Sequence, residues 1–179
     1  MTTWIALFRG INVGGNNLLP MKSLVALLEK LGYEDVATYI QSGNAVFRSS
    51  EKAKDIENAI SAAIAKAYGF APRVLLLTSQ ELQKVTVANP FPNAESNYKS
   101  LHVFFLASTP KRPNLAEIGA LKSKSESFVL TPRAFHLHAP DGVGNSKLAA
   151  RVEKCLGVDA TARNWRTVTR VSELANHLD

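Results

Sequence analysis

The sequence predicts an α+β protein made of two ferredoxin-like βαββαβ halves in tandem, followed by a C-terminal helix. Short apolar segments and stretches with helical spacing follow one another in the order strand, helix, strand, strand, helix, strand, and this order occurs twice. A break rich in proline and asparagine, residues 88–98, separates the two runs. We therefore expect a first half at 1–87, a linker at 88–98 and a second half with the last helix at 99–179.

The first expected strand runs from Thr3 to Arg9. Its alternating residues are apolar on both sides, so both faces of this strand should be covered. Pro20 suits the first position of the next helix, and Gly32 suits its C-terminal end. The apolar stripe of this helix is Met21, Leu24, Leu27, Leu28 and Leu31.

A hairpin should follow, with strands at 36–41 and 45–49 joined by a tight turn at 42–44. Ser50 can cap the second helix, which Gly69 ends. A strand at 73–78 completes the first half. Thr78 and Glu81 then form a capping box for a short helix.

The second half repeats the order without clear sequence identity to the first. Its expected elements are strand 100–106, helix 114–122, hairpin strands 127–131 and 134–138, helix 146–156, strand 158–162 and a final helix capped by Asn164.

Composition limits the class of protein. The 179 residues are 46% hydrophobic and 20% charged, which predicts a substantial core. The single cysteine, Cys155, excludes an internal disulfide and a cysteine-rich metal site. The apolar runs are too short to span a bilayer, so we expect a cytoplasmic protein with no membrane partner. The net charge of +6 permits an anionic partner, although a basic surface without a ligand explains it equally well.

Four motifs extend from near the start of the chain to its last helix: Leu7-Phe8-Arg9-Gly10-Ile11-Asn12-Val13-Gly14-Gly15, Leu19-Pro20-Met21, Tyr39-Ile40-Gln41-Ser42-Gly43-Asn44 and Asn164-Trp165-Arg166-Thr167-Val168. In this order they resemble the bacterial domain-of-unknown-function family 1697. The step Ser146-Lys147-Leu148 is similar to a motif in the second half of that family. The resemblance implies a fold of two ferredoxin-like halves, and it implies no activity.

Glycine and asparagine are concentrated in the segment after the first strand. In ferredoxin-like topology this segment and the hairpin turn lie at the same end of the sheet. Glycine lets backbone N–H groups approach a ligand closely, and the helix after Pro20 directs its positive end there, which suits a phosphate or carboxylate. The segment matches neither G-x-G-x-x-G nor G-x-x-x-x-G-K-[ST]. The expected ligand contacts are Arg9, Asn12, Gly14, Gly15, Asn16, Gln41, Ser42 and Asn44, with Asn17 beside them.

A purely structural explanation of this segment stays open. Glycines supply positive φ angles, and asparagines hydrogen-bond to their own backbone in turns. Arg9, at the end of an apolar strand, is harder to explain in this way, although a buried ion pair would do so.

A second cluster is expected where the turn at 141–147 meets residues 163–166. Lys147 in the first turn of a helix opposes the helix dipole, which indicates a nearby anion. Arg163 and Arg166 can add anion contacts, and Trp165 can stack on a base. Alternatively, Trp165 anchors the last helix in the core and Lys147 is solvated. The expected ligand contacts are Asn145, Ser146, Lys147, Asn164, Trp165 and Arg166.

Other candidate sites are weaker. His136 and His138 share one strand face near Asp141, but no further ligand is evident, so no metal site is predicted. Cys155 is expected to be an inert core thiol. No cofactor is indicated.

The leading functional hypothesis is binding of an anionic ligand, a nucleotide or a nucleic acid, at the two clusters. One alternative is an enzyme that acts on a small phosphorylated or carboxylated metabolite. Another is a scaffold in which the same motifs only maintain the fold. The sequence leaves open the oligomeric state and whether the two clusters share one cleft.

Overall fold

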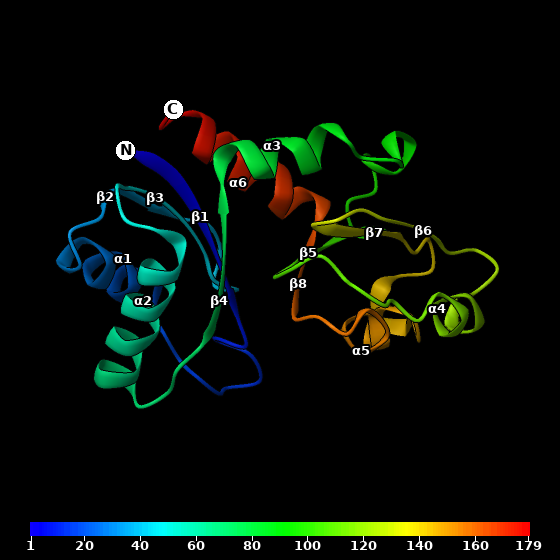
Figure 1. The fold of residues 1–179 in the computed structure, drawn as a ribbon, viewed down its shortest axis with the longest axis horizontal. Helices are drawn as coiled ribbons and strands as arrows, with labels where there is room; N and C mark the ends of the chain where they lie inside the picture. Colours follow the sequence, from blue (N-terminus) through cyan, green and yellow to red (C-terminus); the bar gives the residue numbers. More distant parts are fainter. The chain divides into compact units, whose positions relative to one another are not determined.

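Two four-stranded antiparallel sheets form the framework of the computed structural model, which describes residues 1–179 (Figure 1). The strand orders are β2-β3-β1-β4 and β6-β7-β5-β8, so each half has the same topology. The predicted α+β class with tandem ferredoxin-like halves is confirmed. The chain divides into two compact units, residues 1–84 with 169–179 and residues 85–168. The expected boundaries near residues 87 and 99 remain a prediction.

The first sheet is built on β1 (Thr2–Arg9). This strand pairs with β3 (Asn44–Ser49) on one side and with β4 (Arg73–Thr78) on the other, and β2 (Glu34–Thr38) pairs with β3. Residues 3–8 of β1 are all buried. The prediction that both faces of this strand are covered is confirmed.

Helices α1 (Met21–Lys30) and α2 (Ala53–Tyr68) pack on one face of this sheet (Figure 1). Pro20 lies just before the first turn of α1 rather than within it. Gly69 ends α2 in the left-handed conformation, as predicted. None of the helices is both long and apolar enough to cross a membrane. The core here is made by Trp4, Ala6, Phe8, Leu24, Leu28, Phe47, Ile56, Ile60 and Ile64 with their neighbours.

Two details of the first half were predicted wrongly. Ser50 does not cap α2, because the helix begins at Ala53 after Lys52 and has no side-chain cap. The strand expected at 36–41 ends at Thr38, since Ile40 has a φ of 49° and the chain already turns there. Asp35 also has a positive φ, and the pairing of β2 with β3 shifts register after Glu34.

Both predicted helix starts near the unit boundaries are confirmed. The amide of Glu81 donates to Thr78 Oγ1 and the amide of Thr78 donates to Glu81 Oε2, which forms the capping box of α3 (Ser79–Val87). Asn164 Oδ1 accepts from the amide of Thr167 at 2.9 Å and caps α6 (Trp165–Asn176). At the end of the chain, Ser79 Oγ donates to the carboxylate of Asp179.

The second sheet is built on β5 (Leu101–Leu106). It lies between β7 (Ala134–His138) and β8 (Ala160–Asn164), and β6 (Ser127–Leu130) pairs with β7. Helices α4 (Leu115–Leu121) and α5 (Val152–Leu156) pack on one face of it (Figure 1). Residues 88–98 contain a single 3₁₀ turn, η1 (Pro92–Ala94). The strand expected at 158–162 begins and ends two residues later.

The helix expected at 146–156 is wrong in its first half. A 3₁₀ turn, η2 (Val143–Asn145), precedes this segment, and a second one, η3 (Ala149–Arg151), lies within it before the short α5. Ser146 is extended, with a ψ of 115°, and its hydroxyl accepts from the amide of Ala149. Lys147 is therefore not in the first turn of an α-helix, and the dipole argument for an anion beside it does not apply.

Candidate functional site

The loop between β1 and α1 meets the β2–β3 turn through Asn12. Asn12 Nδ2 donates to the carbonyl oxygens of Leu19 and Gln41, both at 2.9 Å, and Asn12 Oδ1 accepts from the amide of Leu19 at 2.8 Å. The expected approach of these two segments is therefore present. The Asn12 side chain is occupied by backbone groups, in line with the structural explanation of the loop.

The other asparagines of this end behave in the same way. Asn17 Nδ2 donates to Gly10 O at 2.9 Å, whereas Asn16 Nδ2 makes only a long contact of 3.4 Å with Gly14 O. Asn44 is buried, and its Nδ2 donates to Tyr39 O at 2.9 Å. Asn12 and Asn17 themselves have positive φ angles. Their amides thus hold a left-handed backbone in place.

Gly43 joins the turn to the sheet. Its carbonyl accepts from the amide of Phe8, its φ is 81°, and an added Cβ would lie 2.6 Å from Ile11 Cδ1 and 2.7 Å from Phe8 Cβ. Only glycine fits this position without displacing neighbouring atoms.

The remaining expected contacts at this end are on the surface. Arg9 is exposed and lies directly opposite Arg73 of β4 in register. Gly14 and Gly15 also have positive φ angles. A ligand role for these residues stays a prediction. The exposed members of the predicted set are Arg9, Gly14, Gly15, Asn16, Gln41 and Ser42.

The second predicted cluster opens on a cavity of about 330 Å³, which we call the Lys147 cavity. It lies within the second half, between the end of α4, the following loop and the β7–η3 segment. Its volume falls in the range of small-molecule sites. The lining residues are Ala120, Leu121, Ser123, Glu126, Ala139, Asp141, Gly142, Asn145, Ser146 and Lys147.

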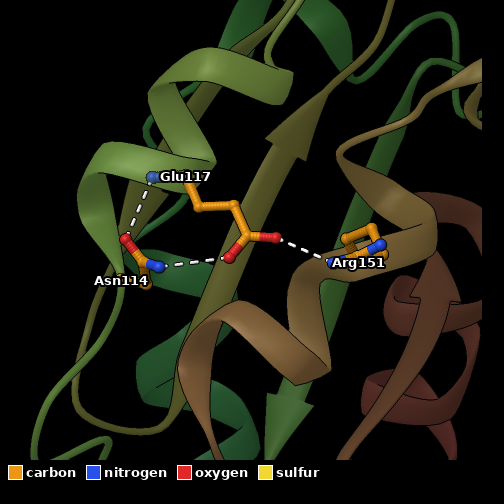
Figure 2. A network of polar contacts seen from close by, with 3 residues as sticks. All are labelled: Asn114, Glu117 and Arg151. Carbon is orange, nitrogen blue, oxygen red and sulfur yellow. Dashed lines mark hydrogen bonds and ion pairs between the residues drawn. The ribbon is translucent and has the colours of Figure 1, made fainter.

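A polar network fixes the helices beside this cavity. Figure 2 shows Glu117 between Asn114 and Arg151. The amide of Glu117 donates to Asn114 Oδ1 at 3.0 Å, Asn114 Nδ2 donates to Glu117 Oε2 at 3.1 Å, and Arg151 Nη2 donates to Glu117 Oε1 at 2.9 Å. Because Arg151 ends η3, this network ties η3 to the start of α4.

The loop after α4 presents a buried carboxylate to the cavity. Glu126 is only 5% exposed, and its Oε2 accepts from the amide of Ser123 at 2.9 Å. Lys122 Nζ donates to the carbonyl oxygens of Ser123 and Glu126 and so closes the loop. Ser125 Oγ donates to Asp141 Oδ2 at 2.6 Å, which joins the loop to the opposite wall.

Several polar groups of the cavity have no partner in the protein. The Lys147 ammonium and the side-chain carboxamide of Asn145 make no hydrogen bond or ion pair, and Glu126 Oε1 accepts no hydrogen bond. The cavity therefore offers one cationic donor, one carboxamide and two carboxylates to a ligand.

Residues 163–166 do not line this cavity. β7 and β8 do end on the same side of the sheet, since His138 pairs with Leu101 and Asn164 with His102. Trp165 is buried, so its ring is not available to stack on a base. The guanidinium carbon of Arg166 lies 3.6 Å from the centre of the Tyr98 ring.

Arg163 is also buried. It is 9% exposed, and its Nη1 donates to the carbonyl of Ala162 at 2.8 Å. Burial lowers the pKa of Arg163 to about 10, so the guanidinium remains charged at neutral pH.

Burial accounts for two of the four histidines, His102 and His136. His136 is fully buried and its Nε2 donates to the carbonyl of Val85 at 3.3 Å, whereas His136 Nδ1 and His102 Nδ1 have no partner. Burial lowers the pKa of His136, and it lowers that of His102 to about 4. No three His, Cys, Asp or Glu side chains are grouped to hold a metal. Cys155 is buried, which raises the pKa of its thiol.

Comparison with known proteins identifies the family. The model of the family described as a protein of unknown function (DUF1697) matches residues 1–136, most of the chain. The chain belongs to the DUF1697 family. The conserved bacterial protein SP0830 from Streptococcus pneumoniae has a similar structure, with a TM-score of 0.67 and 22% identity over 97% of this chain and 98% of that one. This likeness shows that the two proteins share a fold. No match is found among curated proteins.

Sequence reasoning missed two parts of this DUF1697 protein. Glu126 was not singled out, because a glutamate in a serine- and lysine-rich loop has the sequence pattern of a solvated turn. Phe91 was read only as part of the linker. The sequence feature that points to Glu126 is the short polar run between a helix and a strand. In such a run a glutamate side chain can bond to a backbone amide at the end of the helix, as Glu126 does to Ser123.

Proposed function

We propose that the protein binds a small anion that carries hydroxyl groups, such as a sugar phosphate or the ribose phosphate of a nucleotide, in the Lys147 cavity. One observation carries the proposal. A cavity of about 330 Å³ gathers an unpaired ammonium, an unpaired carboxamide and two carboxylates from two segments, the loop after α4 and the β7–η3 segment.

Each charged group fits one part of such a ligand. The Lys147 ammonium supplies donors to a phosphate or carboxylate. Glu126 and Asp141 can only accept hydrogen bonds when ionised, so they require donors, which the hydroxyl groups of a sugar provide. Glu126 Oε1 accepts no hydrogen bond from the protein and is not among the buried atoms that lack a partner, so it is open to the cavity and can accept a hydrogen bond from a ligand.

The mixed charge of the lining bears on the ligand class. A bare inorganic anion would meet two carboxylates and one ammonium, which is unfavourable. A ligand whose anionic group lies at one end and whose hydroxyl groups lie at the other satisfies both kinds of residue. We therefore favour a sugar phosphate over simple phosphate.

The cellular location follows from the same proposal. Phosphorylated sugars and nucleotides are typical cytoplasmic metabolites, and a single buried cysteine is compatible with a reducing compartment. We accordingly propose that the protein acts in the cytoplasm.

Isothermal titration calorimetry at low salt tests the proposed function with ribose 5-phosphate, ribose and inorganic phosphate as probes. We expect ribose 5-phosphate to bind with a Kd of about 1 mM or tighter, and more tightly than phosphate. Lys147→Gln should weaken it about tenfold or more, because a charge-assisted hydrogen bond is lost. Glu126→Gln should weaken the binding of ribose 5-phosphate but not the binding of inorganic phosphate.

Lys111→Gln is the matched control, since Lys111 is an exposed lysine of the same half outside the cavity. It should leave the affinity unchanged. Equal affinity for ribose 5-phosphate in Lys147→Gln and the unsubstituted protein would contradict the proposal. The proposal would also be contradicted if neither ribose 5-phosphate nor inorganic phosphate bound.

A further inference from the structure

A second cavity, of about 300 Å³, lies in the second half beside the first. We call it the Phe91 cavity. His138 and Pro140 line it, whereas Ala139, Asp141 and Gly142 line the Lys147 cavity, so the two cavities adjoin along one short segment. The lining residues are Pro90, Phe91, Pro92, Asn93, Ala94, Asn97, Ser100, His138 and Pro140.

Hydrogen bonds to the backbone hold the walls of the Phe91 cavity in place. The amide of Phe91 donates to Asn89 Oδ1 at 3.0 Å, and the amide of Ala94 donates to the carbonyl of Phe91 at 3.0 Å. The amide of Ala139 donates to the carbonyl of Ser100 at 2.7 Å. Three proline rings further restrict the backbone around the cavity. A ligand would therefore meet a preformed site with little ordering cost.

Two rings form the apolar part of the cavity. The centroids of Phe91 and His138 are 5.7 Å apart with an interplanar angle of 37°, and both residues are only partly buried. Aromatic rings that are open to a cavity offer their faces to a planar ligand. The neighbouring prolines add flat aliphatic surface.

Two carboxamides form the polar part. Asn93 and Asn97 line the cavity and are exposed, and neither side chain makes a hydrogen bond within the protein. A carboxamide presents a donor and an acceptor side by side, which matches the paired donor and acceptor groups on the edge of a nucleobase. A plain hydrocarbon ring would leave both carboxamides unused.

We propose that the Phe91 cavity binds a nucleobase, which stacks on Phe91 and His138 and is hydrogen-bonded at its edge by Asn93 or Asn97. Proteins recognise unpaired bases by this combination of stacking and edge contacts. The inference does not depend on the Lys147 cavity, because a nucleoside without a phosphate is enough to fill the Phe91 site.

Titration with adenosine and cytidine, followed by NMR of ring protons and side-chain amides, tests this proposal. We expect the Phe91 and His138 ring signals and the Asn93 and Asn97 amide signals to shift with at least one of the two nucleosides. Phe91→Leu keeps an apolar side chain and should weaken binding about tenfold or more. Asn97→Ala should weaken it by a smaller factor.

Tyr68→Leu is the matched control, since Tyr68 is a partly exposed aromatic residue on α2, outside the cavity. Its nucleoside affinity should equal that of the unsubstituted protein. Three results would each overturn the proposal: no shift with either nucleoside, shifts confined to other residues, or phenol binding as tightly as the nucleosides. The unsubstituted spectra decide the question even if a variant fails to fold. If the unsubstituted protein bound adenosine but not ribose 5-phosphate, only the proposed function would be contradicted.

Discussion

The two glycine- and asparagine-rich segments look alike in sequence but differ in what their side chains contact. In the β1–α1 loop, Asn12 and Asn17 donate their amides to backbone carbonyls. In the β7–η3 segment, the side chains of Asn145 and Lys147 make no hydrogen bond or ion pair and line a cavity. The comparison teaches that such a segment can be rich in polar groups because the loop needs them or because a ligand does. Counting which groups are already paired separates the two cases.

The largest expected effect on stability is at Gly43, in the β2–β3 turn that packs against the β1–α1 loop. Gly43→Ala should lower the free energy of unfolding by about 3 kcal/mol or more, since it adds left-handed strain and forces a Cβ against Phe8 and Ile11. Urea denaturation measures the change. Gly15→Ala, with a similar φ and open space around it, should cost only about 1 kcal/mol. Equal costs for the two variants would contradict the tight packing of the turn.

The next effect is a dependence of stability on pH that comes from the second half, which contains both His102 and His136. The folded-state pKa of His102 is about 4, against 6.5 for an unperturbed histidine, and burial also lowers the pKa of His136. The unfolded chain therefore binds more protons in this window, and the free energy of unfolding should fall as pH drops from about 6.5 to 4. For His102 the loss is about 2–3 kcal/mol.

Urea denaturation at a series of pH values measures this slope. His102→Gln should make it shallower. His177→Gln is the control, because His177 is exposed, and it should leave the slope as it is. An unchanged slope in His102→Gln would show that burial does not keep this imidazole neutral.

A smaller effect is expected at Asn12. Asn12→Ala removes three hydrogen bonds between side chain and backbone and should destabilise the protein by about 2 kcal/mol, as judged by urea denaturation. Asn16→Ala should cost under about 0.5 kcal/mol, since the Asn16 side chain is exposed and makes one long contact. If Asn16→Ala costs as much as Asn12→Ala, the loop is not held together by the amide of Asn12.

The smallest effect is expected at Lys147. Lys147→Gln should change the free energy of unfolding by less than about 0.5 kcal/mol, because Lys147 is exposed and its ammonium makes no hydrogen bond or ion pair in the protein. Thermal unfolding without ligand measures this. A loss of about 1 kcal/mol or more would assign Lys147 a structural role and make the two segments alike.

Much of the fold was predictable because local rules and the fold agree. The alternating apolar strands, the glycines after α1 and α2, and the caps at Thr78 and Asn164 fixed the element order in both halves. The strand expected at 36–41 and the helix expected at 146–156 failed where single residues adopt backbone angles that the apolar pattern does not reveal. Ser146 Oγ accepts from the amide of Ala149, but the chain leaves helical geometry at Arg151, with φ −121° and ψ 0°, so the α-helix begins only at Val152. Ile40 turns left-handed before the expected strand ends.

The candidate site was less predictable than the fold. The topology indicated which loops lie at one end of a sheet, and Asn145–Lys147 do line a cavity. Sequence spacing does not show which asparagine amides are used by the backbone, nor that Glu126 returns to face that cavity. Those facts depend on pairings between residues that are distant in sequence.

The most direct test of the central claim is a chemical-shift map of the unsubstituted protein titrated with ribose 5-phosphate. We expect the backbone amides of residues 123–126 and 141–147 to shift, and those of residues 10–17 to stay in place. Shifts confined to residues 10–17 and 41–44 would contradict the claim and make the loop after β1 the ligand site.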